Sequence, residues 1–284
     1  MDSLYDKMRV GQSGGKINDF KTKHHVSVVS IGNSRSAHNI VPQIMGENSY
    51  NLSHNGMSLA FHVGVIDQIL SDSIPAIDTI LLHIEPFESY KNDFELERDI
   101  RQLGHFYGEN DFITARINSL SFFERFKYWF SLYRYNGKLL STIKNAMTAS
   151  STSDTQQGYV PLINDSFHLP EKKIGVRDSI FSTKKSVELC DDIDSNIRHI
   201  KELCDEKNIK LICFTSPEFY TNPVEFKELK HFLENENISY YNFKAVSLTD
   251  LGLESNKFWR DPAHLNHSGA EVFTTFFKEV LKTK

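Results

Sequence analysis

Hydrophobic and polar positions along the chain predict strands and helices in alternation. Five short apolar segments stand out, at residues 26–31, 49–53, 79–84, 210–215 and 239–243. Three of them, VSVVSI, TILLHI and KLICFT, are nearly continuous apolar runs, as expected for strands that helices cover on both faces. The five segments therefore predict the strands of one buried sheet.

Segments with helical spacing lie between these runs. Apolar residues recur at helical intervals in two stretches, Leu59, Val63, Ile66 and Leu70, and then Val187, Ile193, Ile197, Ile200 and Leu203. Strands that alternate with helices predict a parallel, doubly wound α/β sheet. Ligands of such sheets bind at the carboxyl ends of the strands, so we expect candidate chemistry directly after an apolar run.

The same pattern indicates one domain with an insertion. Residues 1–24 are polar and contain GQSGGK, which predicts a loosely ordered lead-in to a single domain over residues 25–284. The alternation is interrupted between about residues 105 and 175, which we interpret as an insertion. Within it, TASSTSDTQQG at 148–158 has the composition of a flexible loop.

The insertion contains a broad aromatic stripe with the spacing of one helix. Its members are Phe122, Phe123, Phe126, Trp129, Phe130 and Tyr133. We expect this stripe to pack on the core of the domain. A lid over the substrate and a helix at a membrane surface are the alternatives, and Arg125, Lys127 and Arg134 keep the membrane alternative open.

Composition narrows the class of protein. With 39% hydrophobic and 24% charged residues, the 284-residue chain is typical of a soluble globular protein. A net charge of −5 with interspersed signs argues against a nucleic acid partner. Cys190, Cys204 and Cys213 form no CxxC pair, so we expect small apolar core residues and neither a disulfide framework nor a thiolate zinc site. No apolar run reaches about 18 residues, and the first residues lack a signal-peptide pattern.

The first candidate for chemistry is Ser34, which follows the first predicted strand through Gly32 and Asn33. At this place a serine projects from the carboxyl edge of the sheet, and a following helix offers free amides to a developing negative charge. The alternative is that Ser34 or Ser36 simply caps that helix. The motif is not the G-x-S-x-G turn of α/β-hydrolases.

A second candidate lies near the carboxyl terminus, in FWRDPAHLNHSGAEVFTTFF. Ser268 and Glu271 form an S-x-x-E capping box, which predicts a helix from Ser268. Asp261 and His264 then lie in the loop before it. A serine nucleophile needs a base, and the base needs an orienting group, so this spacing supplies both from one loop.

Two alternatives compete for the same loop. Asp261, His264 and His267 are suitable metal ligands, and a further ligand would have to come from His38, His54 or His83. His264 could also be a hydrogen-bonded structural histidine.

Three segments resemble signature blocks of the SGNH (GDSL-like) hydrolases. IGNSRS at 31–36 resembles the first block, YNLSHNGMS at 50–58 the second, and DPAHLNHSGAEVF at 261–273 the last. They are most similar to a bacterial branch that acts on acyl groups of cell-surface polysaccharides. The blocks follow the family's order over residues 26–280.

The resemblance implies a three-layer α/β/α sandwich with a flavodoxin-like, five-stranded parallel sheet. It also implies roles for individual residues: Ser34 is the nucleophile, His264 the general base and then acid, and Asp261 the orienting carboxylate. No cofactor or metal is implied.

The oxyanion hole departs from the family pattern. The resemblance implies the backbone amides of Ser34 and Gly56 as donors, whereas the third block, which normally adds an asparagine, is replaced here by Glu85-Pro86. Asn55, beside Gly56, is our candidate for the missing donor. A carboxylate in an oxyanion hole would oppose catalysis, so we expect Glu85 to turn elsewhere.

The function expected from this resemblance is a serine esterase that removes an acyl group, most simply acetyl, from a carbohydrate or similar ester. Arg35, His38 and His54 are candidate substrate-binding residues. The alternatives are an O-acyltransferase with the same three residues and a non-catalytic carbohydrate-binding or assembly protein of the same fold. Relatives in this branch often act behind a membrane anchor, which makes membrane proximity an expectation, while the compartment and the oligomeric state stay open.

Overall fold

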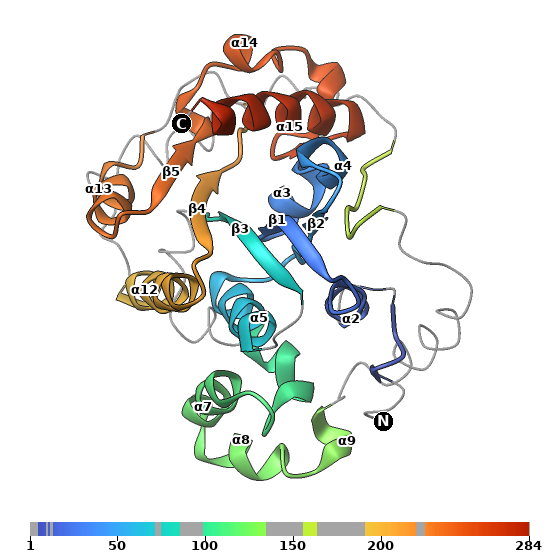
Figure 1. Cartoon of the computed structure of the whole chain (residues 1–284), viewed down its shortest axis with the longest axis vertical. Coiled ribbons are helices and arrows are strands. Elements are labelled where there is room, and N and C mark those ends of the chain that lie inside the picture. The colour runs from blue at the N-terminus through green and yellow to red at the C-terminus, as the bar shows by residue number, and fades with distance from the viewer. Residues whose placement is uncertain are drawn as a thin grey trace, which may run out of the picture.

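The computed structural model describes residues 5–9, 11, 14–71, 75–85, 99–134, 156–163, 191–219 and 225–283. At its centre are five strands, β1 (His25–Ile31), β2 (Ser49–Asn51), β3 (Ala76–His83), β4 (Lys210–Thr215) and β5 (Ser239–Asn242). They form an all-parallel sheet in the order β2-β1-β3-β4-β5 (Figure 1). This is the flavodoxin-like order of doubly wound sheets, so the predicted fold class is confirmed.

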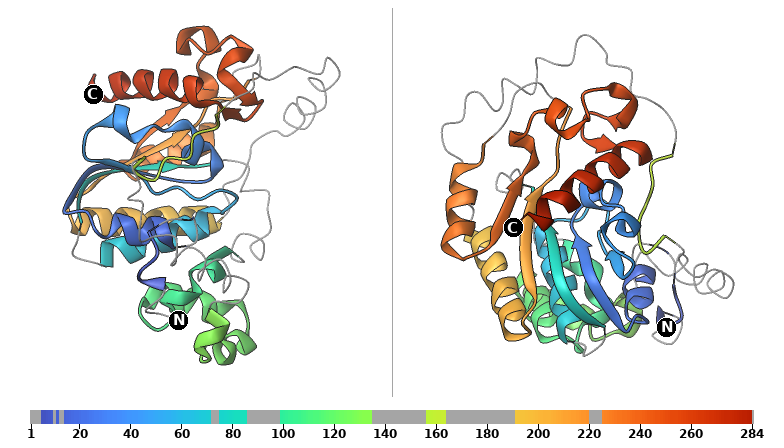
Figure 2. Two further views of the ribbon diagram at one scale, coloured as in Figure 1. Left: turned by 90° about the vertical axis from the view of Figure 1, so that its right-hand side faces the viewer. Right: turned by 45° about the horizontal axis from the view of Figure 1, so that its top comes forward.

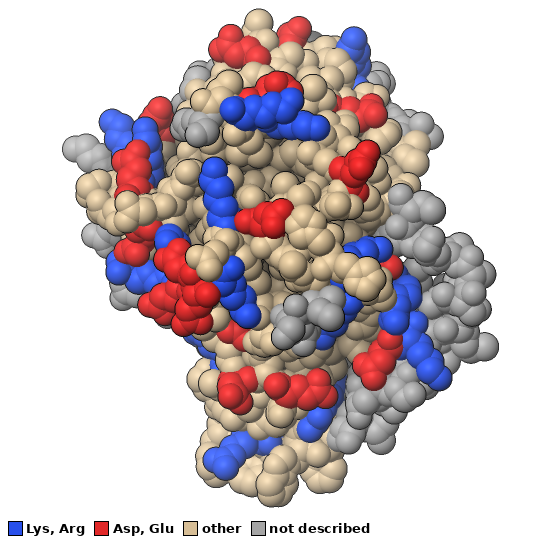
Figure 3. Space-filling view, in the orientation of Figure 1, with Lys and Arg blue, Asp and Glu red and all other residues tan. Residues whose placement is uncertain are grey.

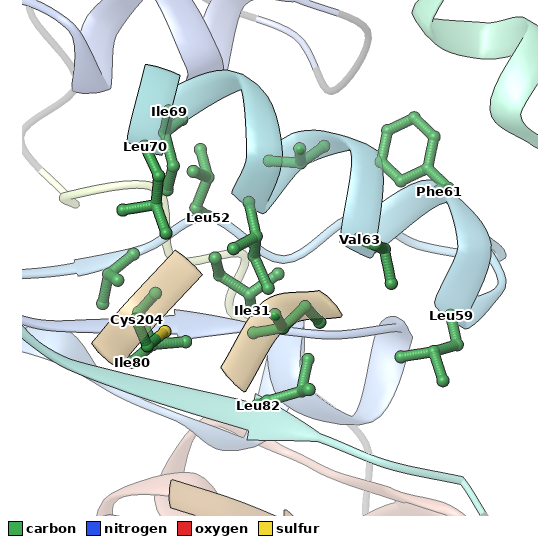
Figure 4. Close-up of a cluster of buried hydrophobic side chains, with 14 of the residues drawn as sticks. Ile31, Leu52, Leu59, Phe61, Val63, Ile69, Leu70, Ile80, Leu82 and Cys204 are labelled. Atoms are coloured by element: carbon green, nitrogen blue, oxygen red, sulfur yellow. The ribbon is translucent and has the colours of Figure 1, made fainter. Parts of the chain in front are cut away.

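Helices cover one face of the sheet with a large apolar core. This layer contains α2 (Gly15–Phe20), α5 (Leu59–Ser71), α12 (Asp191–Glu206) and α13 (Lys227–Asn235) (Figures 1 and 2). Figure 4 shows apolar side chains of α5 directed at the strands, among them Val63 and Ile69 over Ile80 and Leu82. The predicted helix at 59–70 is therefore confirmed.

The buried cysteines bear out their expected role. Cys204 on α12 and Cys213 on β4 are fully buried in this core. Burial raises the pKa of the Cys204 thiol to about 12, which makes it a poor nucleophile or metal ligand at neutral pH. Cys190 and Val187 lie outside the described residues.

The opposite face carries α3 (Ser34–Asn39), α4 (Pro42–Met45) and α15 (His267–Lys282), with η3 (Phe243–Ala245) and α14 (Leu248–Leu251) at its edge. Phe273 and Phe277 of α15 pack with Phe214 of β4. Sheet and helices thus form three layers.

The start of α15 differs from the prediction. The helix begins at His267, and Asn266 is its N-cap, because the Asn266 side chain accepts a hydrogen bond of 3.0 Å from the Gly269 amide. The capping box that predicted Ser268 as the start is therefore wrong. Asparagine is as good a cap as serine, and here it precedes the serine by two positions.

Part of the predicted lead-in is ordered. Residues 15–20 form α2, and its Ile17 and Phe20 are buried in the core. The ammonium of Lys16 donates a 2.8 Å hydrogen bond to the Ser53 carbonyl. The expectation of a loose lead-in was wrong for this segment, because an apolar pair within the polar stretch attaches it to the sheet.

Of the region predicted as an insertion, residues 105–134 are mainly helical and lie beneath α5 in Figure 1, whereas residues 156–163 form a turn and irregular structure. The helical part contains α7 (Asp111–Leu120), α8 (Phe122–Lys127) and α9 (Ser131–Arg134), and it follows η2 (Asp99–Phe106). Ile100, Leu103 and Ile113 join it to the core. Residues 135–155 and 164–175 of the predicted insertion, including most of the loop at 148–158, lie outside the described residues.

The aromatic stripe does not form one buried helix. The chain turns between α8 and α9, so the helical spacing of the stripe is interrupted. Tyr133 packs against the core, whereas five rings are exposed: Phe122, Phe123, Phe126, Trp129 and Phe130. The expectation that the stripe packs on the core was wrong for these five. Within the described residues, no helix combines the length and hydropathy needed to cross a membrane.

Candidate active site

Ser34 stands where β1 ends and α3 begins. The turn is tight because Gly32 lies against His83: a Cβ atom on Gly32 would be 2.4 Å from the Cβ of His83. The cap of α3 is Asn33, whose Oδ1 accepts a 3.0 Å hydrogen bond from the Arg35 amide. The alternative that Ser34 or Ser36 caps this helix is therefore wrong, and the Ser34 hydroxyl is available for another partner.

The loop that carries His264 is fixed by contacts on both sides. Residues Trp259–Asp261 (β6) and His264–Leu265 (β7) form an antiparallel pair. Trp259 is fully buried and donates from Nε1 to the Leu253 carbonyl at 2.9 Å. The Leu265 amide donates to Asn39 Oδ1 at 3.2 Å, which joins this loop to the end of α3.

Ser34, His264 and Asp261 form a hydrogen-bonded chain. The Ser34 Oγ is 2.8 Å from His264 Nε2, and His264 Nδ1 is 2.9 Å from Asp261 Oδ2. Asp261 Oδ1 also accepts the amides of Ala263 at 2.8 Å and His264 at 3.0 Å. The side chains of His264 and Asp261 remain 25% and 45% exposed, so solvent reaches this chain.

The electrostatics of Asp261 suit an orienting role. Burial alone would raise the pKa of this carboxyl, but the hydrogen bonds from His264 and Ala263 outweigh it and hold the pKa below its ordinary value. Asp261 is therefore ionised at neutral pH and accepts the proton on His264 Nδ1. This arrangement leaves the Nε2 lone pair directed at the Ser34 hydroxyl.

A buried cluster of four charges lies beside the serine, at the carboxyl ends of the strands. Arg35 is 2.9 Å from Glu85 and also pairs with Glu218, while Lys244 is 3.1 Å from Glu85 and 3.0 Å from Glu218. None of these side chains is more than 10% exposed. We call these four residues the ion cluster. Glu85 pairs with both cations of this cluster, and its expected orientation away from an oxyanion hole stays a prediction.

The ion cluster neutralises its own charges. Burial would raise the pKa of Glu218, but Arg35 and Lys244 lower it overall, so the carboxylate is ionised at neutral pH. The Arg35 guanidinium faces inward to two carboxylates, and its predicted contact with substrate stays a prediction. Sequence reasoning did not identify Glu218 or Lys244. Their position shortly after β4 and β5 was the available signal.

The two histidines proposed to bind substrate are buried close to the hydrogen-bonded residues Ser34, His264 and Asp261. His38 Nδ1 lies 2.7 Å from the Val160 carbonyl, and its ring is 5.7 Å from that of His264. Burial lowers the pKa of His38, so it is neutral at pH 7. The His54 ring packs against Phe61 at 4.9 Å. Substrate contact by either ring stays a prediction.

The loop proposed to complete the oxyanion hole runs beside the serine turn. The His54 amide donates a 2.9 Å hydrogen bond to the Gly32 carbonyl, which aligns residues 54–56 with this turn. Gly56 has a φ of 72°, and no atom lies within 4 Å of where its Cβ would be. Gly56 and Asn55 thus stay candidates for oxyanion contacts.

The alternative metal site finds no support in the part of the chain that the structure describes. There, no group of three or more His, Cys, Asp or Glu side chains could hold a metal ion. His267 instead has its Nδ1 3.2 Å from the Tyr159 hydroxyl and its Nε2 3.8 Å from Glu271.

Comparison of the sequence with models of protein families and with curated proteins finds no match.

Proposed function

We propose that this protein is a serine esterase that cleaves an acyl ester through an acyl-enzyme intermediate. The observation that carries the proposal is the hydrogen-bonded chain from Ser34 through His264 to Asp261. A hydroxyl, an imidazole and a carboxylate in this order are the parts that nucleophilic acyl transfer requires.

In the proposed reaction, Ser34 Oγ attacks the ester carbonyl while His264 Nε2 takes the hydroxyl proton. The Asp261 carboxylate stabilises the imidazolium that forms. His264 then gives the proton to the departing alcohol, which leaves the acyl group on Ser34. Water attacks this acyl-enzyme with His264 again as base, and the acid is released as Ser34 regains its proton.

The tetrahedral intermediates need hydrogen-bond donors for their oxyanion. As the first residue of α3, Ser34 has an amide without a carbonyl partner one turn earlier in the helix, and this amide is our first donor. The Gly56 amide and the Asn55 side chain are the further donors we propose. Each well-placed donor lowers the barrier by about 3–4 kcal/mol. Because Glu85 pairs with Arg35 and Lys244, its carboxylate does not oppose this charge.

The substrate class rests on the resemblance to SGNH hydrolases of bacterial polysaccharides, which supports an O-acetylated carbohydrate. The same chemistry would transfer the acyl group to a sugar hydroxyl if that group, rather than water, resolved the acyl-enzyme. Release of acetate from an O-acetylated glycan and transfer of acetyl to a sugar acceptor are separate measurements that distinguish these products.

The test uses p-nitrophenyl acetate as substrate and a fluorophosphonate as a covalent label for the serine. We expect the native chain to release p-nitrophenol and to be labelled on Ser34. Ser34→Ala and His264→Ala should each lower kcat by at least about a thousandfold.

The matched control is His267→Ala, which removes the next histidine along the chain without touching Ser34. This variant should keep the native rate and the label. Equal rates in the native chain, Ser34→Ala and His264→Ala would overturn the proposal, and absence of both turnover and labelling would favour a non-catalytic binding protein.

A further inference from the structure

Five aromatic side chains form an exposed surface at one end of the molecule. They are Phe122 (72% exposed), Phe123 (70%), Phe126 (47%), Trp129 (77%) and Phe130 (71%), and we call them the aromatic face. Large apolar side chains are costly to leave in water in such numbers, and a contiguous group of them indicates a contact surface. The proposed esterase chemistry makes no use of it.

Four rings of the aromatic face, those of Phe122, Phe123, Phe126 and Trp129, follow one another in contact, and the segment is attached to the body of the protein. The Phe126 ring lies 5.3 Å from Phe122 and 6.5 Å from Trp129, so one ring leads to the next. Tyr128, which lies between Phe126 and Trp129 in the sequence, is only 4% exposed. Its ring stacks on that of Tyr107, with 5.1 Å between the ring centres. The buried tyrosine faces the body of the protein, and the five other rings therefore point outward.

The charge around the aromatic face is opposite to that of the whole chain. Although the net charge is −5, residues 122–134, which carry the five rings, include a single acidic residue, Glu124. The same segment has three basic residues, Arg125, Lys127 and Arg134, so its formal charge is +2. On α8, Arg125 and Lys127 are both exposed, beside the rings. In Figure 3 the lower end of the molecule is mostly uncharged, with basic side chains near it and acidic ones above.

We propose that the aromatic face docks the protein on an anionic membrane surface. Phenylalanine and tryptophan rings insert at the boundary between headgroups and acyl chains, while arginine and lysine beside them pair with anionic headgroups. The position of α8 and α9 fits this contact, since they form the projecting end of the molecule in Figures 1 and 2. Docking does not depend on the proposed esterase activity.

Tryptophan fluorescence offers a direct test, because the chain has only two tryptophans. Trp129 is in the aromatic face, whereas Trp259 is fully buried. We expect vesicles of phosphatidylcholine and phosphatidylglycerol to shift the tryptophan emission to shorter wavelength. The full chain should also sediment together with these vesicles on centrifugation. Pure phosphatidylcholine vesicles should do neither. Trp129→Phe should lose the shift, because Trp259 stays in its core.

Two pairs of variants separate the apolar and the charged contributions. Phe123→Ser with Phe130→Ser should weaken vesicle binding by at least about tenfold. Ile163→Ser, at an apolar side chain that is 69% exposed elsewhere, is its control and should bind like the native chain. Arg125→Glu with Lys127→Glu should abolish the preference for anionic vesicles, while Lys227→Glu with Lys230→Glu on α13 should preserve it.

Three results would overturn this proposal. The native chain could fail to bind anionic vesicles, or the Phe123→Ser, Phe130→Ser variant could bind them as well as the native chain. The third is a native dimer in solution that this variant converts to a monomer, which would assign the aromatic face to contact between two copies. Circular dichroism of each variant establishes that its fold is intact before either comparison is made.

Discussion

At the scale of single residues, Asp261 is the test of whether the hydrogen-bonded chain is functional or merely structural. Asp261→Asn keeps the size of the side chain but removes its charge and can place an amide N–H against His264 Nδ1. The ring would then hold its proton on Nε2, where it cannot accept from Ser34. We expect kcat for p-nitrophenyl acetate to fall by about ten-thousandfold, by precedent.

Asp78 provides the matched control for this substitution. It also pairs with a histidine, at 2.9 Å from Nε2 of His25, but near the amino ends of the strands and in an exposed position. Asp78→Asn should leave kcat unchanged. A native rate in Asp261→Asn would show that the orienting role is misassigned.

Gly32 is the residue on which the geometry of the serine turn depends. In Gly32→Ala the added methyl group would meet the Cβ of His83 at 2.4 Å and that of Ser36 at 3.0 Å, so the backbone must move. We expect urea unfolding to show a loss of about 1–3 kcal/mol, as for other overpacked sites. The rate per folded molecule should also fall, because Ser34 is two residues away.

Gly252→Ala separates these two effects. Gly252 has a φ of 70° in the C-cap of α14, so alanine there costs about 1–2 kcal/mol through backbone strain. This strain is remote from Ser34. The control should therefore lose stability and keep its activity, and equal activity losses in both variants would contradict the assigned role of Gly32.

At the scale of elements, the ion cluster joins the segments that follow the carboxyl ends of four strands, β1, β3, β4 and β5. Arg35 comes from the start of α3 after β1, Glu85 follows β3, Glu218 follows β4, and Lys244 follows β5. Glu218→Gln removes one negative charge and leaves Arg35 and Lys244 with Glu85 alone. Removing one partner of a buried ion pair costs about 3–5 kcal/mol, and we expect a loss of this size in urea unfolding.

A compensating substitution shows whether charge balance is the cause. Lys244→Met with Glu218→Gln removes one charge of each sign and restores neutrality around Arg35 and Glu85. We expect this double variant to be more stable than Glu218→Gln. A double variant that loses the sum of both single effects would instead indicate independent packing roles.

The elements were predicted more accurately than their contacts. VSVVSI and KLICFT became β1 and β4 because continuous apolar runs have few alternatives to a buried strand. Aromatic residues at helical spacing did not predict burial, because spacing gives the face of a helix and not what covers it. The pairing of Glu218 with Arg35 joins positions 183 residues apart, and no local pattern specifies such a contact.

At the scale of the whole molecule, the contacts of the candidate site also join residues that are far apart in the sequence. Ser34 and His264 are separated by 230 positions, and their meeting depends on the packing of α15 against α3, the helix that follows β1. Sequence motifs predicted which residues would meet. They did not predict Asn39, which holds the His264 loop through the Leu265 amide, because asparagine in a helix carries no distinctive signal.

The stability of the whole fold should depend on pH through histidines that are buried without charge. Burial lowers the pKa of His62 from 6.5 to about 4, and it lowers the pKa of His83 in the same direction. Between pH 6.5 and pH 4 these histidines bind more protons in the unfolded chain than in the folded chain. The free energy of unfolding therefore falls as the pH falls from 6.5 toward 4. His62 alone should contribute a loss of about 2 kcal/mol between pH 7 and pH 5.

Carboxylates change the stability in a lower pH range than these histidines, so the two contributions can be measured separately. In the folded protein the pKa values of Glu218 and Asp261 lie below their ordinary values of 4.5 and 3.8. The stability that these carboxylates contribute is therefore complete above the ordinary pKa values, and it is lost as the pH falls through the lower pKa values of the folded state. Urea unfolding at pH 7 and pH 5 thus reports the histidines. His62→Gln should be less stable at pH 7 but lose less on acidification, whereas His231→Gln, at an exposed histidine, should keep the native difference. An undiminished loss in His62→Gln would exclude His62 as a source of the acid sensitivity.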